Sequence, residues 1–417
     1  MNGTVHVIGA GMAGLAAAVD LSRRGSRVAL HEASGQAGGR CRSFYDPTLG
    51  RLIDNGNHLI LSGNDAISAY LSTIGASDAL IGPNRAQFPF IDLVDGLRWL
   101  LRPGGRLPLW LLDSRRRVPG SNPTDYLQVL KLARAGPGDT VSSLVGRDGV
   151  LYHRLWEPLT VAVLNATPDE AAATLLWQVL KETFGRGEAA FRPRLARAGL
   201  GPSIVEPAVT WLQERGVQAT FHQRLRAVGA VKGTAATLSF TDGDVAIGCE
   251  DAVVLAVPPS VAASLLPDLI VPTEFRAIVN GHFRLPEVPK ADMPFLIGIV
   301  GGTAQWVFVR GDVASVTVSA ADVLTEESSE SIAATLWPEV LRALGFPPAP
   351  LPAYRIVKEK RATFAQTPEQ IRLRPGTRTS LNNVVLAGDW IDTGLPATIE
   401  GAVRSGQVAA DTVFAGK

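Results

Sequence analysis

The sequence predicts an α/β protein (α+β overall), in which a domain built on a parallel sheet carries an inserted domain of mixed sheet and helices. Three observations lead to this prediction. Residues 4–32 alternate strand, helix and strand around a glycine-rich turn, and a similar alternation returns near residue 203. A last buried strand and helix follow residue 384. Between these stretches the pattern changes to short strands, helices and long strand-like runs.

The composition narrows the class of protein. A chain of 417 residues with 46% hydrophobic and 19% charged residues suits two or three globular domains. The formal net charge of +1 provides no field that would attract nucleic acid, so we expect no nucleic-acid partner. The two cysteines, Cys41 and Cys249, are too few for a disulfide framework or a structural zinc site, so we expect no metal.

The start of the chain and its apolar runs indicate where in the cell the protein is expected. No basic segment precedes the apolar run Val5–Ile8, so we expect no signal peptide. No run reaches the roughly 18 apolar residues that a membrane-spanning helix needs. We therefore expect a cytoplasmic protein, either soluble or peripheral on the inner face of the cell membrane.

The elements of the first half are predicted in chain order. The apolar run at 5–8 predicts a strand, and the Ala- and Leu-rich stretch 12–24 predicts a helix. A second strand over 27–31 ends at Glu32. Residues 86–112 read as short strands and turns, and residues 124–199 read mostly as helices.

The second half returns to alternating elements. The predicted elements are a helix over 203–215, strands over 217–221 and 251–257, strand-like residues 275–320, a helix over 328–344, a strand over 384–387 and a helix over 398–413. The order indicates one nucleotide-binding domain made from residues 1–75, 200–272 and 376–417. A substrate-binding domain would then comprise residues 76–199 and 273–375, with a mainly helical part at about 120–199.

The glycine-rich turn has the spacing of a dinucleotide site. The sequence Gly-Ala-Gly-Met-Ala-Gly over residues 9–14 follows a strand and opens a helix, and Glu32 ends the next strand. Gly9 permits the tight turn, Gly11 lets a pyrophosphate approach the backbone, and Gly14 lets the helix pack closely on the sheet. The helix N-terminus would face the phosphates, and Glu32 would accept hydrogen bonds from ribose hydroxyls. The alternative is a glycine-rich turn without a ligand.

A second motif favours FAD over NAD. Glu32 is followed by Gly38-Gly39-Arg40, and this pattern resembles the flavin amine oxidase and phytoene desaturase superfamily. The resemblance implies that the arginine approaches the pyrophosphate, a task that suits a planar and permanently charged guanidinium. The parallel-sheet domain is therefore predicted to be a Rossmann-like FAD-binding domain.

The end of the chain carries a third motif. A buried strand ends at Gly388-Asp389, and Pro396-Ala397-Thr398 precedes the last helix. Asp389 can offer its carboxylate to ribityl hydroxyls, and the helix can direct N–H groups at the flavin pyrimidine edge. The alternative for Asp389 is a helix cap. The predicted FAD-binding residues are Gly9, Gly11, Ala13, Gly14, Glu32, Ala33, Gly39, Arg40, Gly56, Asn57, His58, Leu59, Leu225, Val257, Gly388, Asp389, Pro396, Ala397 and Thr398.

Within this superfamily the chain resembles the hydroxysqualene dehydroxylases of bacterial hopanoid synthesis, also called squalene-associated FAD-dependent desaturases. The matching stretches lie in order along nearly the whole chain, at residues 53–59, 154–159 with 164–165, 278–283, 358–364 and 387–401. One departure is Asn57, where the family pattern leads us to expect glutamine.

The resemblance implies reductive removal of the hydroxyl of hydroxysqualene to give squalene and water. Because the carbinol carbon lies beside a double bond, protonation and loss of the hydroxyl leave an allylic cation, which a hydride from N5 of reduced flavin would quench. Such a reaction needs an acid near the hydroxyl, a dry channel and aromatic faces. With one dinucleotide motif in the chain, the electrons would come from an external reductase or from weakly bound NAD(P)H.

The predicted catalytic residues are His58, Glu157, Asn165, Asn280 and His282. His58 lies in a segment that passes the reactive edge of the flavin in related proteins, and the alternative is a hydrogen-bonded core histidine. Glu157 stands in an apolar stretch, where burial would raise its pKa, and the alternative is a helix cap or salt bridge. The other three can bind the substrate hydroxyl or be structural. Trp306 and Phe308 can line the channel or pack in the core.

Residues 97–119 combine tryptophans and leucines with positive charge. The basic residues are Arg98, Arg102, Arg106, Arg115, Arg116 and Arg117, and only Asp113 offsets them. One hypothesis is that this segment, with Trp99 and Trp110, docks on an anionic bilayer and admits the C30 substrate. The alternative is a solvated surface with arginine stems packed along it.

Three further functions stay open at the level of sequence. A carotenoid-type desaturase would share the fold and the apolar channel but would move hydride from substrate to flavin. The remaining two functions are those of an amine oxidase and of a non-catalytic lipid-binding flavoprotein.

Overall fold

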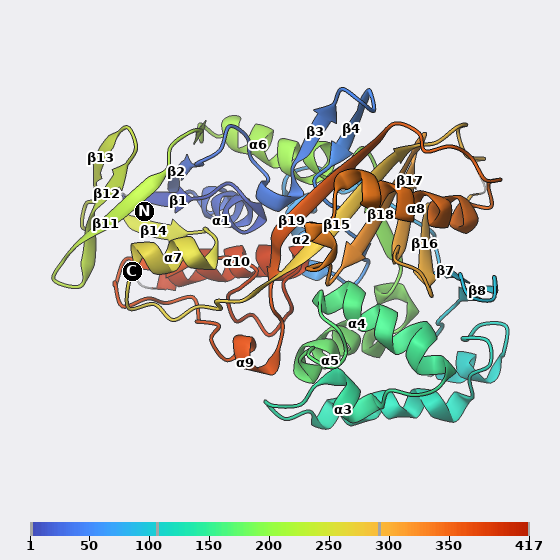
Figure 1. Ribbon diagram of the computed structural model, residues 1–417. Coiled ribbons are helices and arrows are strands. Elements are labelled where there is room, and N and C mark those ends of the chain that lie inside the picture. The colour runs from blue at the N-terminus through green and yellow to red at the C-terminus, as the bar shows by residue number, and fades with distance from the viewer. Residues whose placement is uncertain (1–2, 106–107, 291–292, 416–417) are drawn as a thin grey trace.

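The computed structural model describes residues 3–105, 108–290 and 293–415. A parallel sheet with its helices forms one part of the molecule, a large mixed sheet stands beside it, and a layer of helices lies under the mixed sheet (Figure 1). The fold is therefore of the mixed α and β class that the sequence predicts. None of the helices in the described ranges has the length and apolar character that crossing a bilayer requires.

The parallel sheet collects strands from distant parts of the chain. Its order is β10 (Ala219–Thr220), β2 (Arg27–His31), β1 (Thr4–Ile8), β14 (Ala252–Leu255) and β20 (Val384–Leu386). All neighbouring pairs run parallel. The three segments that the sequence assigns to a nucleotide-binding domain thus contribute to one sheet, while the exact domain boundaries stay a prediction.

Both faces of this sheet are covered, which explains why its strands are almost continuously apolar. Val5, Val7 and Val254 pack in one core with the helices α1 (Met12–Arg23) and α10 (Ile399–Ala415). The opposite face packs against α7 (Pro259–Leu265) and a small antiparallel sheet of β11 (Leu225–Val231), β12 (Thr234–Phe240) and β13 (Gly243–Ala246). The sequence did not predict that small sheet, because β11 is mostly exposed and lacks an apolar alternation.

The second large sheet is mixed, as predicted. Its order is β19 (Tyr354–Phe364), β15 (Phe275–Arg284), β18 (Val313–Ser319), β17 (Trp306–Arg310), β16 (Leu296–Val300), β7 (Phe88–Asp92) and β8 (Arg98–Leu101). Only the β16–β7 pair is parallel. The helix α8 (Ser329–Leu344) covers one face, where its Leu336 and Val340 share a core with Val279 and Phe283.

The opposite face of the mixed sheet packs against the helical layer. That layer contains η3 (Pro123–Arg134), α3 (Val141–Val145), η4 (Tyr152–Trp156), α4 (Glu157–Leu164) and α5 (Ala173–Glu182). One apolar cluster joins Phe90, Trp306 and Phe308 of the sheet to Trp156 and Leu164 of the layer. This apolar contact fixes the helical layer to the face of the mixed sheet that lies opposite α8.

The remaining elements connect these parts. They are β3 (Ser43–Asp46), β4 (Arg51–Asp54), β5 (Ile60–Leu61), α2 (Asp65–Thr73), β6 (Leu80–Ile81), η2 (Pro108–Leu112), β9 (Pro193–Ala196), η7 (Gly201–Val205), α6 (Glu206–Gln213), α9 (Pro368–Ile371) and the short turns η1 (Gly39–Cys41), η5 (Phe184–Arg186), η6 (Glu188–Ala190) and η8 (Leu324–Glu326). Trp110 lies in the 3₁₀ turn η2 and not in a strand, because Pro108 begins a turn there.

Candidate cofactor and active site

The three glycines after β1 have distinct surroundings. A Cβ on Gly9 would lie 2.3 Å from the carbonyl oxygen of Ala256, and Gly9 has a φ of +104°. A Cβ on Gly14 would lie 1.8 Å from the carbonyl oxygen of Gly9, so α1 packs directly on the turn. A Cβ on Gly11 would meet no protein atom within 4 Å. The backbone is thus open at Gly11, the position where a pyrophosphate would approach the N-terminus of α1.

Glu32 lies beside this turn at the end of β2. Its Oε2 accepts a hydrogen bond from the amide of Ala10 at 2.7 Å, and its Oε1 accepts one from the amide of Ser34 at 2.8 Å. Each carboxylate oxygen keeps a further lone pair for a ribose hydroxyl. The amide of Gly38 donates to the carbonyl of Ala10 at 2.8 Å, which holds the second glycine-rich loop against the first.

Arg40 joins the first motif to the last. Its Nη2 donates to Oδ1 of Asp389 at 2.7 Å, and its Nη1 donates to the carbonyl oxygen of Ala362. The charge of Asp389 raises the pKa of Arg40. Asp389 therefore lies with its carboxylate toward Arg40, and the two predicted FAD ligands from opposite ends of the chain are in contact.

The last helix starts beside this ion pair. Thr398 precedes α10, and its Oγ1 accepts a hydrogen bond from the amide of Gly401 at 3.1 Å. The amide of Ala397 donates to Oε1 of the buried Gln366 at 2.8 Å. Hydrogen bonds therefore fix Ala397 and Thr398 directly before the first turn of α10. The N–H groups of that turn are the ones predicted to contact the flavin pyrimidine edge.

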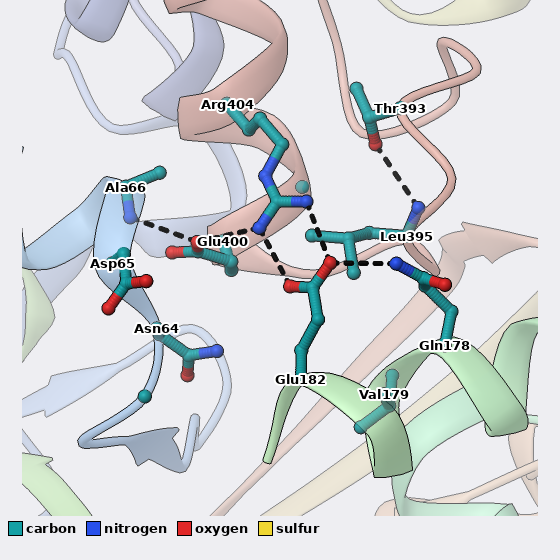
Figure 2. A network of polar contacts seen from close by, with 12 residues as sticks. Asn64, Asp65, Ala66, Gln178, Val179, Glu182, Thr393, Leu395, Glu400 and Arg404 are labelled. Atoms are coloured by element: carbon teal, nitrogen blue, oxygen red, sulfur yellow. Dashed lines mark hydrogen bonds and ion pairs between the residues drawn. The ribbon is translucent and has the colours of Figure 1, made fainter. Parts of the chain in front are cut away.

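A partly buried ion-pair network anchors the start of α10 (Figure 2). Glu400 accepts hydrogen bonds from the amides of Ala66 and Ile67, at 2.9 and 3.0 Å, and so caps the N-terminus of α2. Arg404 donates to both oxygens of Glu182, at 2.8 and 3.1 Å, and to Glu400 at 3.3 Å. The network ties α10 and α2 of the nucleotide-binding part to α5 of the helical layer.

The segment after β4 runs over the mixed sheet, and Asn57 of this segment is hydrogen-bonded to side chains of the sheet. Asn57 donates from Nδ2 to Oγ1 of Thr317 at 3.1 Å, and Thr317 donates to Oδ1 of Asn280 at 2.9 Å. The backbone amide of Asn57 also lies 3.4 Å from Oδ1 of Asn280. Asn57, Thr317 and Asn280 thus form one polar group on the sheet face opposite α8.

The strand register places aromatic side chains beside these amides. Thr317 pairs with Trp306 as well as with Asn280, and Ser315 pairs with both Phe308 and His282. Directly paired residues point to the same face of a sheet. The face therefore changes from amide and hydroxyl groups on β15 and β18 to aromatic groups on β17.

His58 and His282 are both neutral at pH 7. Burial, and then the charge of Arg40, lower the pKa of His58 to about 4. Burial lowers the pKa of His282 to about 4, and its Nδ1 lies 2.8 Å from Oγ of Ser315. A neutral imidazole at position 58 can orient a hydroxyl by hydrogen bonding, and to act as the proton donor it would first have to be protonated.

These histidines make stability depend on pH. The unfolded chain binds a proton at a histidine with a pKa of about 6.5, while the folded chain resists it down to about 4. The histidine contribution is therefore complete above about pH 6.5 and is lost as the pH falls toward 4, by on the order of 3 kcal/mol for His282. We expect the fall in urea midpoint between about pH 7.5 and pH 5 to be smaller in His282→Gln than in the wild type. An equal fall in both proteins would contradict this.

Glu157 is a correction to the sequence prediction. Its side chain is 46% exposed and lies 3.2 Å from Nδ1 of His153, one turn away. The expected burial is therefore absent, because Glu157 begins α4 on the solvent side while Trp156 faces the core. The structure supports the salt-bridge alternative.

Asn165 is also placed in a structural role. It ends α4 with a φ of +49°, a conformation that asparagine tolerates. Its Nδ2 donates to Oγ1 of Thr363 at 3.0 Å, and its Oδ1 accepts from the amide of Ala320 at 2.7 Å. Both atoms of the side-chain amide are thus engaged by protein groups, which supports the structural alternative.

The other predicted cofactor residues differ in exposure. Ala13 is buried in the first turn of α1, while Ala33 is exposed beside Glu32. Gly56 lies against the amide of Asn280, since a Cβ there would be 3.3 Å from Nδ2. The carbonyl of Val257 accepts a hydrogen bond from Nε1 of Trp390 at 2.9 Å. Leu225 is buried at the start of β11, and Leu59 packs on the aromatic cluster.

Glu359 is a candidate that the sequence prediction missed. It pairs in register with Ile278, on the same face as Asn280, and its Oε2 accepts a hydrogen bond from Nδ2 of the buried Asn55 at 3.3 Å. Its charge contributes to the raised pKa of Arg40. The alternation of β15 could have identified the facing residues, but their partners on β19 depend on a register that the sequence does not specify.

The segment 97–119 only partly fits a membrane-docking surface. Trp99 is buried and stacks on Phe90 with ring centroids 5.2 Å apart. Four guanidinium groups donate to backbone carbonyl oxygens and so belong to the fold: Arg98, Arg102, Arg116 and Arg117. Arg106 lies outside the described residues. The predicted docking of Trp99 on a bilayer is therefore wrong, because this side chain faces the core.

Comparison with known proteins relates these features to a family. The profile described as flavin containing amine oxidoreductase matches residues 12–414. Hydroxysqualene dehydroxylase from Rhodopseudomonas palustris is 50% identical over 417 residues, which cover 100% of the chain and 99% of that protein. The same enzyme from Zymomonas mobilis is 43% identical over 407 residues, with coverage of 97% and 98%. In fold, the chain is similar to cyclohexylamine oxidase from Brevibacterium oxydans, with a TM-score of 0.72, 16% identity and 99% coverage of each chain.

Proposed function

The chain belongs to the flavin-containing amine oxidoreductases, as an FAD-dependent oxidoreductase of the hydroxysqualene dehydroxylase family, and we propose that it reductively removes the hydroxyl group of hydroxysqualene to give squalene and water. The observation that carries the proposal is the sheet face next to the FAD motifs. There the polar group of Asn57, Thr317 and Asn280 borders the aromatic residues Trp306 and Phe308. A substrate with one hydroxyl on a long hydrocarbon matches such a polar and aromatic boundary.

The proposed reaction breaks the C–O bond of the substrate and forms a C–H bond. A proton goes to the departing oxygen, which leaves as water, and the allylic carbon then receives a hydride. Bound FAD, once reduced by an external reductase or by NAD(P)H, supplies that hydride. The chain would contribute an acid, hydrogen bonds that orient the hydroxyl, and a face from which water is excluded.

Several residues fit the tasks of holding FAD. The open backbone at Gly11 would receive the pyrophosphate, and Glu32 would bind the ribose. Arg40 and Asp389, which pair with each other, would contact the pyrophosphate and the ribityl chain. The N-terminus of α10 would face the pyrimidine edge.

The apolar part of the substrate would lie along the aromatic cluster. Trp306 and Phe308 are part of a buried cluster that includes Phe90 and Trp156, and Leu59 packs against it next to His58. The π-face of such a residue stabilises a cation by about 2 kcal/mol when water is absent. The same cluster would keep water from capturing the cation before the hydride arrives.

Glu359 is our candidate for the acid, and to act as one its carboxylate would first have to take up a proton. It is a half-buried carboxyl group on the face of Asn280, and the amide of Asn55 orients it. We expect Glu359→Gln to reduce squalene formation by roughly a hundredfold, the lower end of the range for a general acid, and to leave FAD binding unchanged. Single-turnover rates of reduced enzyme measure the effect, and Glu157→Gln is the matched control that should retain wild-type rates. Equal rates in E359Q and the wild type would exclude this role.

The proposed activity is tested with purified enzyme under anaerobic conditions. The FAD-loaded protein is photoreduced and mixed with hydroxysqualene, and the flavin absorbance and the hydrocarbon products are followed together. We expect flavin reoxidation with one squalene formed per flavin. A carotenoid-type desaturase would give no squalene, and a non-catalytic flavoprotein would stay reduced, so either result would contradict the proposal.

We propose that the enzyme works at the cytoplasmic face of the cell membrane. Hydroxysqualene is an apolar C30 isoprenoid and would partition into the bilayer, so an enzyme that acts on it gains from contact with the lipid surface. Electron supply would also come from outside the chain, from a reductase or from NAD(P)H.

A further inference from the structure

Four exposed leucines lie on two neighbouring 3₁₀ segments of the helical layer. Leu109 and Leu112 of η2 are 66% and 73% exposed, and Leu127 and Leu130 of η3 are both 57% exposed. The ring of Trp110 on η2 contacts the ring of Tyr126 on η3, with centroids 5.8 Å apart. The two segments are thus packed together and lie at the outer side of the helical layer, away from the parallel sheet (Figure 1). Both present leucine to solvent.

The helix η3 has three distinct sides. Because a 3₁₀ helix has three residues per turn, residues three apart lie on one side. Tyr126 and Leu132 point into the core, while Leu127 and Leu130 point outward. The third side carries the exposed Lys131 and Arg134. An apolar side next to a basic side is typical of segments that lie in the interface of an anionic bilayer.

The charge around the leucines is positive. Residues 108–134 contain five basic residues and two acidic ones, Asp113 and Asp125. Both acids are engaged within the segment, since Asp113 pairs with Arg115 and Asp125 accepts a hydrogen bond from the amide of Asn122. A second copy of this face would bring like charges together, whereas anionic headgroups would neutralise them.

The segment is rigid enough to present these side chains. The hydroxyl of Tyr126 accepts a hydrogen bond from the amide of Val118 at 2.9 Å, and Arg117 donates to the carbonyl oxygens of Leu111 and Ser121. The loop between η2 and η3 is therefore fixed by buried contacts. Its arginines hold the loop together, while the leucines stay free of the core.

We propose that η2 and η3 dock on an anionic lipid surface, with Leu109, Leu112, Leu127 and Leu130 inserted among the acyl chains and Lys131 and Arg134 at the headgroups. The docking surface is thus the leucine face of residues 108–134, and the tryptophan of residue 99 takes no part in it. This surface joins the same apolar cluster that lines the proposed substrate face, since Tyr126 and Leu132 belong to it.

The test is flotation of the FAD-loaded protein with vesicles. One set contains phosphatidylcholine with phosphatidylglycerol, and the other contains phosphatidylcholine alone. We expect binding to the anionic set at low salt, and a loss of roughly a hundredfold in affinity for the double variant L127S/L130S. The matched control V231S/V323S removes two side chains that are at least as exposed, far from η3 in the chain, and should bind like the wild type.

The basic side is tested separately. K131Q/R134Q should lose about thirtyfold in affinity for anionic vesicles, because each of the two basic residues near such a surface contributes about 1 kcal/mol. Flavin absorbance and the melting temperature verify that each variant is folded. The proposal is overturned if the wild type does not float, if the control loses as much as L127S/L130S, or if L127S/L130S instead changes the oligomeric state. Flotation requires no turnover, so its result is independent of the proposed reaction.

Discussion

Replacement of Gly11 by valine is expected to give a folded protein that no longer holds FAD. The Cβ at this position would touch no protein atom within 4 Å, and the φ of −74° suits any residue. The change should therefore cost the fold no more than about 1 kcal/mol, the usual range for a poor N-cap. The valine side chain would fill the space through which a pyrophosphate reaches the N-terminus of α1. We expect FAD affinity to fall by roughly a hundredfold or more, measured by flavin fluorescence during reconstitution.

Two other glycines serve as controls for Gly11→Val. Gly138 also has no protein atom near its Cβ and no positive φ, so Gly138→Val is the matched control and should bind FAD normally. Gly14→Val should fail to fold, because its Cβ would lie 1.8 Å from the carbonyl oxygen of Gly9. A yellow, FAD-saturated Gly11→Val protein would show that the pyrophosphate does not approach at this turn.

Replacement of Arg404 by methionine is expected to cause the largest loss of stability among single changes in the ion-pair network. The guanidinium lies between Glu182 and Glu400, and the methionine would leave two carboxylates facing each other in a partly buried site (Figure 2). Removal of one partner from a buried pair costs several kcal/mol. Because Arg404 and Glu182 are partly exposed, we expect on the order of 2 to 3 kcal/mol, measured from urea unfolding.

The loss of stability in R404M should arise from the two carboxylates that are left without a cation. The double variant E182Q/R404M removes one of the two facing carboxylates, so it should be more stable than R404M alone. Lys360→Met breaks the exposed pair with Glu326 and should change stability by less than about 1 kcal/mol. If R404M lost no more unfolding free energy than Lys360→Met, the network would contribute no more to stability than an exposed surface pair does.

The sequence predicted the parts of the site that depend on local order. A glycine turn, a helix start and an acidic strand end are formed by neighbouring residues, so Gly9, Gly11, Gly14 and Glu32 lie where their spacing indicates. Arg40 lies in the short turn η1 and Asp389 follows the end of β20, and the structure brings the two side chains into contact.

Other residues depend on contacts that a single sequence does not specify. Glu359 and Thr317 face the site only because β19 and β18 pair with β15 in a certain register, and a shift by one residue would turn both away. Glu157 read as buried because its neighbours are apolar, yet the turn of the helix places it toward solvent. Burial of one helical residue is set by packing, not by local composition.

The contact between Arg40 and Asp389 joins residues 349 positions apart, and β20 is the last strand of the sheet to be synthesised. While the ribosome is still translating, the early βαβ unit has neither its edge strand nor the acidic partner of its arginine. The closing of so long a loop carries an entropic cost that local contacts do not offset. We therefore expect β20 and Asp389 to join the site only after the rest of the sheet has been translated, and a nascent chain stalled before position 384 to expose apolar strands that are prone to aggregation.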